Sequence, residues 1–509
     1  MIRALTSQQS FDLEARAVAE QGVTLAGLMR SAGAAVAEQA AALAPEGAVI
    51  VLTGPGNNGG DGWAAALDLH AAGRDVRVFS VVDPSALKGI AADAAAEAIR
   101  SGVRFDVPSQ AIVASDLAEA ALVVDALLGI GAKGALRDPL AAWVSAVNES
   151  GVPVLAVDVP TGVDSDTGAV AGTAVDADAT VTFTALKRGL VLYPGAAFAG
   201  DLFVADIGVA PVIADVKAAP EVWTAEEYAA LIPLPAPDTH KNARGRVLVV
   251  AGSAAYPGAA ILAARGAMRA GAGYVTLAVP DAVVPIAQGH LAACPVVGLP
   301  QSRTHTLSSA ALEKVVALAR EYDAVVLGPG LTVANGAATV ARGMVAGIKV
   351  PLVIDADGLN ALVDARDLLE RRSAATVLTP HPGELGRLLG RSPGEVQADR
   401  VSSSAELAGA NRAVVLKGAG TVTSCDARQV INTSGSPALA TAGTGDVLAG
   451  VIGALLAQGL GPLEAGALGA YLHGRAGEAA AAALTPVCVT AEDIPGWIPA
   501  AVAEVLDSW

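Results

Sequence analysis

The sequence predicts an α/β fold in two domains. Strand-like apolar runs alternate with alanine-rich, helix-like stretches along the whole chain, which is typical of parallel sheets covered by helices on both faces. The chain has 509 residues, more than a single hydrophobic core usually organises. The series of elements also starts a second time near the middle, so we expect one sheet in each half of the chain.

Each predicted strand is a short apolar run. In the first half the runs are residues 49–52, 76–81, 122–125, 154–157, 179–183 and 202–205. In the second half they are residues 247–251, 274–279, 324–327, 352–354, 376–378 and 413–416. No repeat of short period is visible, so a solenoid is not expected.

A proline-rich segment separates the two series. Five prolines lie in residues 210–241, and proline both stiffens a linker and interrupts regular structure. We therefore predict an N-terminal domain at residues 1–210, a linker at 211–240 and a C-terminal domain at 241–509.

The composition argues against several classes of partner. The formal net charge of −17 disfavours a nucleic-acid partner, because a phosphate backbone needs a broad basic face. Three scattered cysteines, Cys294, Cys425 and Cys488, fit a reducing compartment without a disulfide framework. Residues 1–17 lack the apolar core of a signal peptide, and the apolar stretch 447–457 is too short to span a bilayer. We expect a cytoplasmic protein with no membrane partner.

A glycine-rich loop, GPGNNGGDG at residues 54–62, follows the first predicted strand. It offers free backbone N–H groups to an anion where a helix begins. Its glycines satisfy the GxGxxG spacing, and Asp83 lies about where a ribose-binding acid would stand, so a dinucleotide-binding fold is one alternative. Asn57, Asn58 and Asp61 favour another interpretation, a site that holds a ligand or cation through side-chain oxygens.

Two aspartates end predicted strands of the first half. Asp125 and Asp158 each close an apolar run, and ligands of such folds bind at the carboxyl edge of the sheet. The alternative is that each aspartate only caps the next helix. Asn58, Asp125 and Thr161 would together supply hard oxygen ligands for an alkali or alkaline-earth cation.

The motifs GPGNNGGDG, DALLGIGAKG, VDVPTGVDSDTG and ATVTFTALKRGLVLYPG resemble those of the NAD(P)H-hydrate epimerase family over about residues 5–209. The resemblance implies a Rossmann-like three-layer sandwich that interconverts the R and S forms of NADH or NADPH hydrated at nicotinamide C6 (NADHX and NADPHX). It places potassium on Asn58, Asp125 and Thr161. Asp158 is the candidate general acid/base, because proton transfer at the C6 hydroxyl can open and remake that centre. Lys133 would assist or bind phosphate. The implied hydrate-binding residues are Asn57, Asn58, Gly59, Gly60, Asp61, Gly129, Ile130, Gly131, Ala132, Lys133, Gly134, Ala135 and Asp158.

A second glycine-rich loop, AGTGDVLAG at residues 442–450, gives the stronger of the two signals. Gly443 and Gly445 let the backbone approach an anion closely, and the following helix directs its positive end at the same place. Bound phosphate would repel Asp446, which makes sense if Asp446 takes a proton from an attacking hydroxyl. The alternative is a first-turn aspartate favoured by the helix dipole.

Other loops after predicted strands would close the same pocket. His381, in the HPGE segment, is predicted to be a pocket residue. These loops are AGSAAYPGAA (251–260), GPGL (328–331), DADGLN (355–360), HPGE (381–384) and KGAGT (417–421).

These second-half motifs resemble the ADP-dependent NAD(P)H-hydrate dehydratase family, a branch of the ribokinase-like fold, over about residues 223–498. The resemblance implies that Asp446 activates the C6 hydroxyl for attack on the terminal phosphate of ADP. Phosphate then leaves, and ADP becomes AMP. Magnesium bridging the phosphates is expected, with Glu384 as candidate ligand. The implied hydrate contacts are Ala259, Gly330, His381 and Asp446, and the nucleotide contacts are Lys417, Gly418, Ala419, Gly420, Thr421 and Gly445.

Both resemblances imply one bifunctional enzyme of coenzyme repair, which acts on NADHX, NADPHX and ADP. A first alternative is a ribokinase-like small-molecule kinase, because the GTGD loop also serves such kinases. A second is that the N-terminal domain only binds a ligand. A homo-oligomer is expected, and the choice between ADP and ATP stays open.

Overall fold

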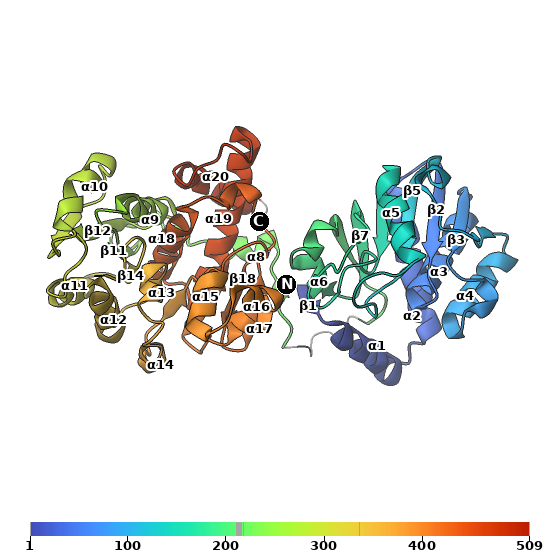
Figure 1. Cartoon of the computed structure of the whole chain (residues 1–509), viewed down its shortest axis with the longest axis horizontal. Helices are drawn as coiled ribbons and strands as arrows, with labels where there is room; N and C mark the ends of the chain where they lie inside the picture. Colours follow the sequence, from blue (N-terminus) through green and yellow to red (C-terminus); the bar gives the residue numbers. More distant parts are fainter. Residues whose placement is uncertain (1, 210–215, 217, 335, 508–509) are drawn as a thin grey trace. The chain divides into compact units, whose positions relative to one another are not determined.

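The computed structural model describes residues 2–209, 216, 218–334 and 336–507. The chain divides into two compact units, one of Ile2–Ala219 and one that starts at Pro220 (Figure 1). The division lies within the predicted linker, of which residues 211–215 and 217 are outside the described residues. After Pro220, the linker segment holds strand β10 (Glu221–Val222) and helix α8 (Ala225–Ala229). Tyr228 of α8 is buried and stacks on Tyr471 at 3.8 Å between ring centroids, so this stretch packs as part of the second unit.

The N-terminal unit contains a seven-stranded sheet in which every neighbouring pair is parallel. All six predicted strands are present, and the short edge strand β4 is an addition. In spatial order the strands are β4 (Arg104–Asp106), β3 (Val76–Ser80), β2 (Ala48–Thr53), β5 (Ala120–Ala126), β6 (Val154–Val157), β7 (Ala179–Phe183) and β9 (Asp201–Ala205). A further parallel pair joins β1 (Ile2–Leu5) to β8 (Leu186–Lys187).

Alternating residues of each strand face opposite layers of this unit. Val49 and Val51 pack in a core with α1 (Ser7–Gln21), α2 (Leu25–Leu43), α3 (Asn57–Ala71) and α4 (Gly89–Arg100). Ile50 and Leu52 pack in a second core with α5 (Leu140–Ser150). The short helix α6 (Arg188–Val191) follows β8. Burial on both faces explains why the strands appear as continuous apolar runs.

The C-terminal unit holds a longer, mostly parallel sheet. Its six predicted strands are present and parallel, but β18 and β19 add an antiparallel hairpin that the alternating pattern did not predict. In spatial order the strands are β13 (Val296–Leu299), β12 (Tyr274–Pro280), β11 (Arg246–Val250), β14 (Ala324–Leu327), β15 (Leu352–Ile354), β16 (Thr376–Leu378), β17 (Arg412–Leu416), β18 (Val422–Cys425), β19 (Arg428–Ile431) and β10.

Helices also cover both faces of the second sheet (Figure 1). One core joins the sheet to α9 (Pro257–Arg269), α18 (Thr444–Ala457), α19 (Pro462–Leu484) and α20 (Ile494–Asp507). The other joins it to α11 (Ala311–Ala319) and α12 (Ala337–Gly347). The remaining helices are α10 (Val284–His290), α13 (Asp357–Asn360), α14 (Asp367–Arg371), α15 (Pro382–Leu389), α16 (Pro393–Ala398) and α17 (Arg400–Ala405). The predicted α/β fold in two domains is confirmed.

The strand order of each sheet reverses at one point, and such switch points are where ligands of open α/β sheets bind. In the first sheet the switch lies between β2 and β5, and in the second between β11 and β14. Gly54 N–H, just after β2, donates to Ala126 O at 3.0 Å, and Gly252 N–H, after β11, donates to Pro329 O at 2.7 Å. At each switch point, therefore, the segments at the ends of the two neighbouring strands contact each other.

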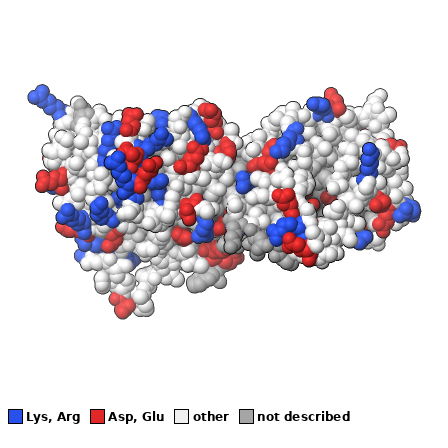
Figure 2. All heavy atoms as spheres, turned by 90° about the horizontal axis from the view of Figure 1, so that it is seen from below, with Lys and Arg blue, Asp and Glu red and all other residues white. Residues whose placement is uncertain are grey.

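On the face seen in Figure 2, Lys and Arg side chains are interspersed with Asp and Glu side chains. Within the described ranges, no helix is both long enough and apolar enough to cross a membrane.

Candidate active sites

A cavity of about 390 Å³ opens at the switch point of the N-terminal sheet. Its walls come from α1, α2, the start of α3, the loop after β5 and the end of β6. Among the predicted site residues, those that line it are Asn57, Asn58, Asp61, Gly129, Ile130, Gly131, Ala132 and Asp158. Sequence positions separated by a hundred residues therefore meet in one concave site.

The first glycine-rich loop is shorter than its sequence suggested. Helix α3 already begins at Asn57, so Asn57 to Asp61 form its first turn and their N–H groups face the cavity end of the helix. Only glycine fits at position 54, because the backbone of Leu127 lies so close that a Cβ would be 1.8 Å from Leu127 O. Asp83 instead accepts a hydrogen bond from Ser85 N at 2.9 Å as the cap of a short 3-10 turn, so it has a local structural role.

Two of the candidate potassium ligands, Asp125 and Thr161, are in direct contact, and the third, Asn58, packs against the loop after β5. The Asp125 carboxylate, fully buried, accepts from Thr161 N and Thr161 Oγ1, both at 2.8 Å. Thr161 Oγ1 in turn accepts from Leu128 N at 3.0 Å. A Cβ on Gly129 would lie 3.0 Å from Asn58 Oδ1, so the amide packs against the same loop. Neither aspartate of the predicted pair, Asp125 or Asp158, caps a helix.

Burial raises the pKa of Asp125 to about 6, although the hydrogen bonds from Thr161 and Leu127 oppose this shift. No ion pair between described residues involves Asp125. A buried carboxylate without a counter-charge is costly, so the carboxylate, the Thr161 hydroxyl and the Asn58 amide fit a hard monovalent cation.

Asp158 lies in a strained backbone position with φ of 65° directly after β6. Its Oδ1 accepts from Lys187 Nζ at 2.5 Å and from Thr182 Oγ1 at 3.1 Å. Lys187, only 2% exposed, also donates to Phe183 O at 2.9 Å. Positive φ outside glycine is uncommon and clusters at functional sites. The fold thus holds Asp158 at the cavity with a buried cation behind it.

Lys133, Gly134 and Ala135 lie in a neighbouring cavity of about 440 Å³, which shares Leu128 and Ala132 with the first. Lys133 Nζ pairs with Asp166 at 3.0 Å, and this hydrogen bond raises the pKa of Lys133. Lys133 therefore stands beside the Asp158 cavity and not inside it. Gly59 and Gly60 are buried in α3 and line neither cavity.

In the C-terminal unit, the second glycine-rich loop turns directly into α18. Gly443 has φ of 100° at the N-cap, and Thr444 begins the helix. A Cβ on Gly445 would lie 3.2 Å from Lys417 Nζ, so the turn and the lysine are in contact. Burial raises the pKa of Asp446 to about 7, and the charges of Asp355, Asp357 and Glu384 add to this.

Lys417 is the positive centre of this carboxylate group. Its Nζ donates to Asp355 Oδ1 at 2.7 Å and lies 3.8 Å from Glu384 Oε2. Burial opposes the charge of Lys417, but the carboxylates of Asp355 and Glu384 raise its pKa overall. Among the described residues, no group of three or more His, Cys, Asp or Glu side chains is placed to hold a metal ion.

The remaining predicted contacts come from three other parts of the C-terminal unit. Ala259 and Gly330 meet at the switch point, because a Cβ on Gly330 would lie 3.0 Å from Ala259 Cβ. His381 caps α15 through Nδ1, which accepts from Gly383 N at 3.0 Å, and its backbone N donates to Glu384 Oε2 at 2.8 Å. The segment Lys417, Gly418, Ala419, Gly420 and Thr421 connects β17 to β18.

Comparisons with known proteins cover both units. Residues 247–499 match the family model described as NAD(P)H-hydrate dehydratase, and residues 25–189 match the YjeF-related protein N-terminus. The bifunctional NAD(P)H-hydrate repair enzyme Nnr of Thermofilum pendens is 39% identical over 96% of this chain and 94% of that protein. The Nnr of Salinibacter ruber is also 39% identical, over 96% and 94%. The chain belongs to the Nnr family of bifunctional NAD(P)H-hydrate repair enzymes.

A solved structure is similar to the C-terminal unit of this Nnr family member. The ADP/ATP-dependent NAD(P)H-hydrate dehydratase of Bacillus subtilis, co-crystallised with ATP and Mg²⁺, is 29% identical. The match covers 56% of this chain and 99% of the Bacillus subtilis chain, with a TM-score of 0.49.

The sequence did not point to four side chains of these sites. They are the half-buried Glu14, which lines the N-terminal cavity, and the buried Lys187, Arg400 and His473. Lys187 stands inside the motif ATVTFTALKRG, where its place among apolar residues was the available signal. Burial lowers the pKa of His473 to about 4, so this histidine near Thr444 is neutral. Glu14 and Arg400 carry no local pattern that separates them from surface charges.

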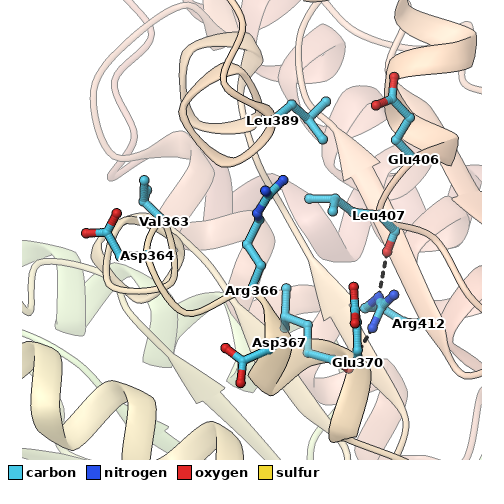
Figure 3. Close-up of a pocket in the computed structure, with 10 residues that line it drawn as sticks. Val363, Asp364, Arg366, Asp367, Glu370, Leu389, Glu406, Leu407 and Arg412 are labelled. Atoms are coloured by element: carbon cyan, nitrogen blue, oxygen red, sulfur yellow. Dashed lines mark hydrogen bonds between the residues drawn. The ribbon is translucent and has the colours of Figure 1, made fainter.

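A further cavity of about 560 Å³ lies in the C-terminal unit of this chain, and none of the predicted site residues lines it. Figure 3 shows Arg412 hydrogen-bonded to the backbone of Leu407. The Arg412 guanidinium donates to Leu407 O at 2.5 Å and to Leu369 O at 2.6 Å. Arg412 is the first residue of β17, so this cavity lies at the opposite end of that strand from Lys417.

Proposed function

We propose that the N-terminal unit interconverts the R and S forms of NADHX and NADPHX, and that the C-terminal unit dehydrates the S form to NADH or NADPH. ADP is the phosphoryl donor and becomes AMP and phosphate. The observation that supports this proposal is that, in a chain of the Nnr family, each unit has its own candidate site with a buried carboxylate, Asp125 in the first unit and Asp355 in the second.

In the N-terminal site, Asp158 acts on the C6 hydroxyl of the hydrate. The first turn of α3 and the loop Gly129 to Ala132 line the cavity and supply N–H groups for the hydrate. Asn58, Asp125 and Thr161 hold K⁺, and the donor set supports this because Asp125 is a buried carboxylate without an ion-pair partner among the described residues. When bound, K⁺ neutralises Asp125 beneath the substrate loop.

In the C-terminal site, Asp446 takes the proton of the C6 hydroxyl, whose oxygen attacks the terminal phosphorus of ADP. The bond to the bridging oxygen breaks and AMP leaves. The ring nitrogen lone pair then expels phosphate from C6, and loss of a C5 proton restores the dihydropyridine. N–H groups at the start of α18 and the ammonium of Lys417 stabilise the phosphate charge.

Mg²⁺ is the cation that we propose for the nucleotide. The ammonium of Lys417 contacts the carboxylates of Asp355 and Glu384 and interacts with the charge of Asp446, so an additional anion needs positive charge. Mg²⁺ usually binds proteins through one or two carboxylates plus phosphates and water. We therefore infer that it enters with ADP and that Glu384 holds it.

A coupled assay tests the proposal. Chemically hydrated NADH is incubated with ADP or with ATP, and the return of dihydronicotinamide absorbance is followed for the wild type and for Asp446→Ala. We expect the wild type to restore NADH and the variant to lose this activity. Equal activity in both would contradict the role of Asp446, and a released phosphorylated product would favour the small-molecule kinase.

Cytoplasmic location and homo-oligomeric assembly stay predictions from the sequence. Light scattering on the purified chain measures its mass in solution, and a monomeric mass would contradict the predicted homo-oligomer. Fractionation of the producing cells tests the location.

A further inference from the structure

Three carboxyl groups and one ammonium stand together at the N-terminal cavity. Glu14 of α1, Asp61 of α3 and Asp158 after β6 all line it. Lys187 of β8 is the buried cation behind Asp158, at 2.5 Å. One ammonium cannot balance three carboxylates in a poorly solvated site. We therefore expect at least one of the three carboxyl groups to keep its proton.

The geometry distinguishes the three carboxyl groups. Asp158 forms an ion pair with the ammonium of Lys187 and accepts a hydrogen bond from the hydroxyl of Thr182. Asp61 and Glu14 have no ion-pair partner among the described residues. Burial raises the pKa of Asp61 well above its usual range, and the charges of Asp158 and Glu14 raise it further, while Lys187 lowers it. Burial, followed by the charge of Asp158, also raises the pKa of Glu14.

We propose that Asp61 is the second catalytic residue of the epimerisation: its carboxyl group gives a proton to the ring nitrogen while Asp158 takes the proton of the C6 hydroxyl. This inference rests on the proposed epimerase function. Two carboxyl groups kept in different protonation states are what a paired acid and base require.

The proton transfers balance without any further reactant. Asp158 removes the hydroxyl proton, the C6–O bond becomes a carbonyl, and the electron pair of the C6–N1 bond moves to N1, which takes the Asp61 proton. The open aldehyde turns about its C5–C6 bond. N1 then attacks the other face of C6, its proton returns to Asp61, and the proton on Asp158 returns to oxygen.

Glu14 and Lys187 are positioning residues in this scheme. Burial and the charge of Asp158 raise the pKa of Asp61, and the charge of Glu14 raises it further. The ammonium of Lys187 holds the Asp158 carboxylate at the cavity through its ion pair. Glu14 lies in α1, before the residues 25–189 that match the family model, so this part of the site comes from outside the matched segment.

The first test is Asp61→Asn in the full chain, which keeps the side-chain shape but cannot transfer a proton. We expect the rate of interconversion between R and S hydrates to fall about 10²- to 10⁴-fold, with a nearly unchanged KM. ADP-dependent dehydration of pure S hydrate should stay at the wild-type rate. Wild-type interconversion in Asp61→Asn would overturn the inference, whereas absence of interconversion in the wild type would instead refute the epimerase function.

The second test uses pH and does not depend on the Asp61 variant folding. The acid must be protonated, so epimerisation should decline on the alkaline side as Asp61 loses its proton. Glu14→Gln removes a charge that raises the Asp61 pKa, and the alkaline limb should move to lower pH. Glu20→Gln, the same change at an exposed position of α1, should leave it in place. An alkaline limb that stays fixed in Glu14→Gln would overturn the assignment.

Discussion

At the scale of single residues, Asp446 should set the pH dependence of dehydration. Burial and the neighbouring carboxylates raise its pKa to about 7, and a general base works only when it is ionised. We expect the kcat/KM of ADP-dependent dehydration to increase with pH through about 7 and then to level off. Rates of the S hydrate measured on both sides of that pH check this, and a profile without an acidic limb would contradict it.

Asp446→Asn keeps the size of this side chain and removes the base, so the dehydration rate should fall about 10²- to 10⁴-fold. The interconversion of R and S hydrates in the same preparation serves as the control. An equal fall of both activities would contradict a role of Asp446 that is confined to dehydration.

Thr161 provides a second test at the residue scale, directed at the potassium proposal. Its hydroxyl contacts Asp125 at 2.8 Å, so Thr161→Val removes one oxygen at nearly constant volume. We expect K⁺ to raise the melting temperature of the wild type, compared with a large organic cation, and to have no such effect in the variant. Thr161→Ser should keep the K⁺ effect.

Thr180→Val is the matched control, because Thr180 is also buried but donates to Ala199 O at 2.7 Å, away from this group. The K⁺ effect should persist in Thr180→Val. A K⁺ effect of full size in Thr161→Val would contradict the ligand set.

At the scale of elements, Arg400 of α17 connects its helix to the nucleotide segment between β17 and β18. Its guanidinium, 3% exposed, donates to Leu416 O at 2.7 Å, to Lys417 O at 3.1 Å and to Gly420 O at 3.1 Å. Arg400→Met would remove these three hydrogen bonds, and a hydrogen bond from a charged group contributes about 1.5–3 kcal/mol.

The released segment should bind ADP less well, and we expect the KM for ADP to rise about tenfold, equivalent to ~1.4 kcal/mol. Arg391→Met is the control, since Arg391 only makes a half-exposed pair with Glu406 and such pairs contribute about 0–1 kcal/mol. Steady-state kinetics with varied ADP decide the matter, and an unchanged KM in Arg400→Met would contradict the role of this element.

The elements also show what a sequence can predict. The runs at 49–52 and 247–251 were recognisable as strands because burial on both faces selects apolar residues throughout. The hairpin of β18 and β19 was not, since its polar residues Thr423, Ser424 and Gln429 obscure the apolar pattern. The ends of strands located Asp125 and Asp158. Lys187 was missed, because its role depends on a contact with Asp158 across 29 positions of the chain.

At the scale of the whole molecule, the two activities should be separable. Each unit has its own sheet with a core on both faces, and a domain with its own hydrophobic core can in principle fold alone. We expect residues 1–219 and residues 220–509, expressed separately, to unfold cooperatively on their own. The first piece should interconvert R and S hydrates without ADP, and the second should dehydrate only the S hydrate.

Mixing the two pieces should restore NADH from both epimers, because the S form that the first piece makes is consumed by the second. The full chain and an Asp446→Asn full chain are the reference proteins, and the latter should interconvert the epimers without restoring NADH. A second piece that folds but dehydrates nothing would show that its site needs the first 219 residues, and the assignment of one complete active site to each unit would then be wrong.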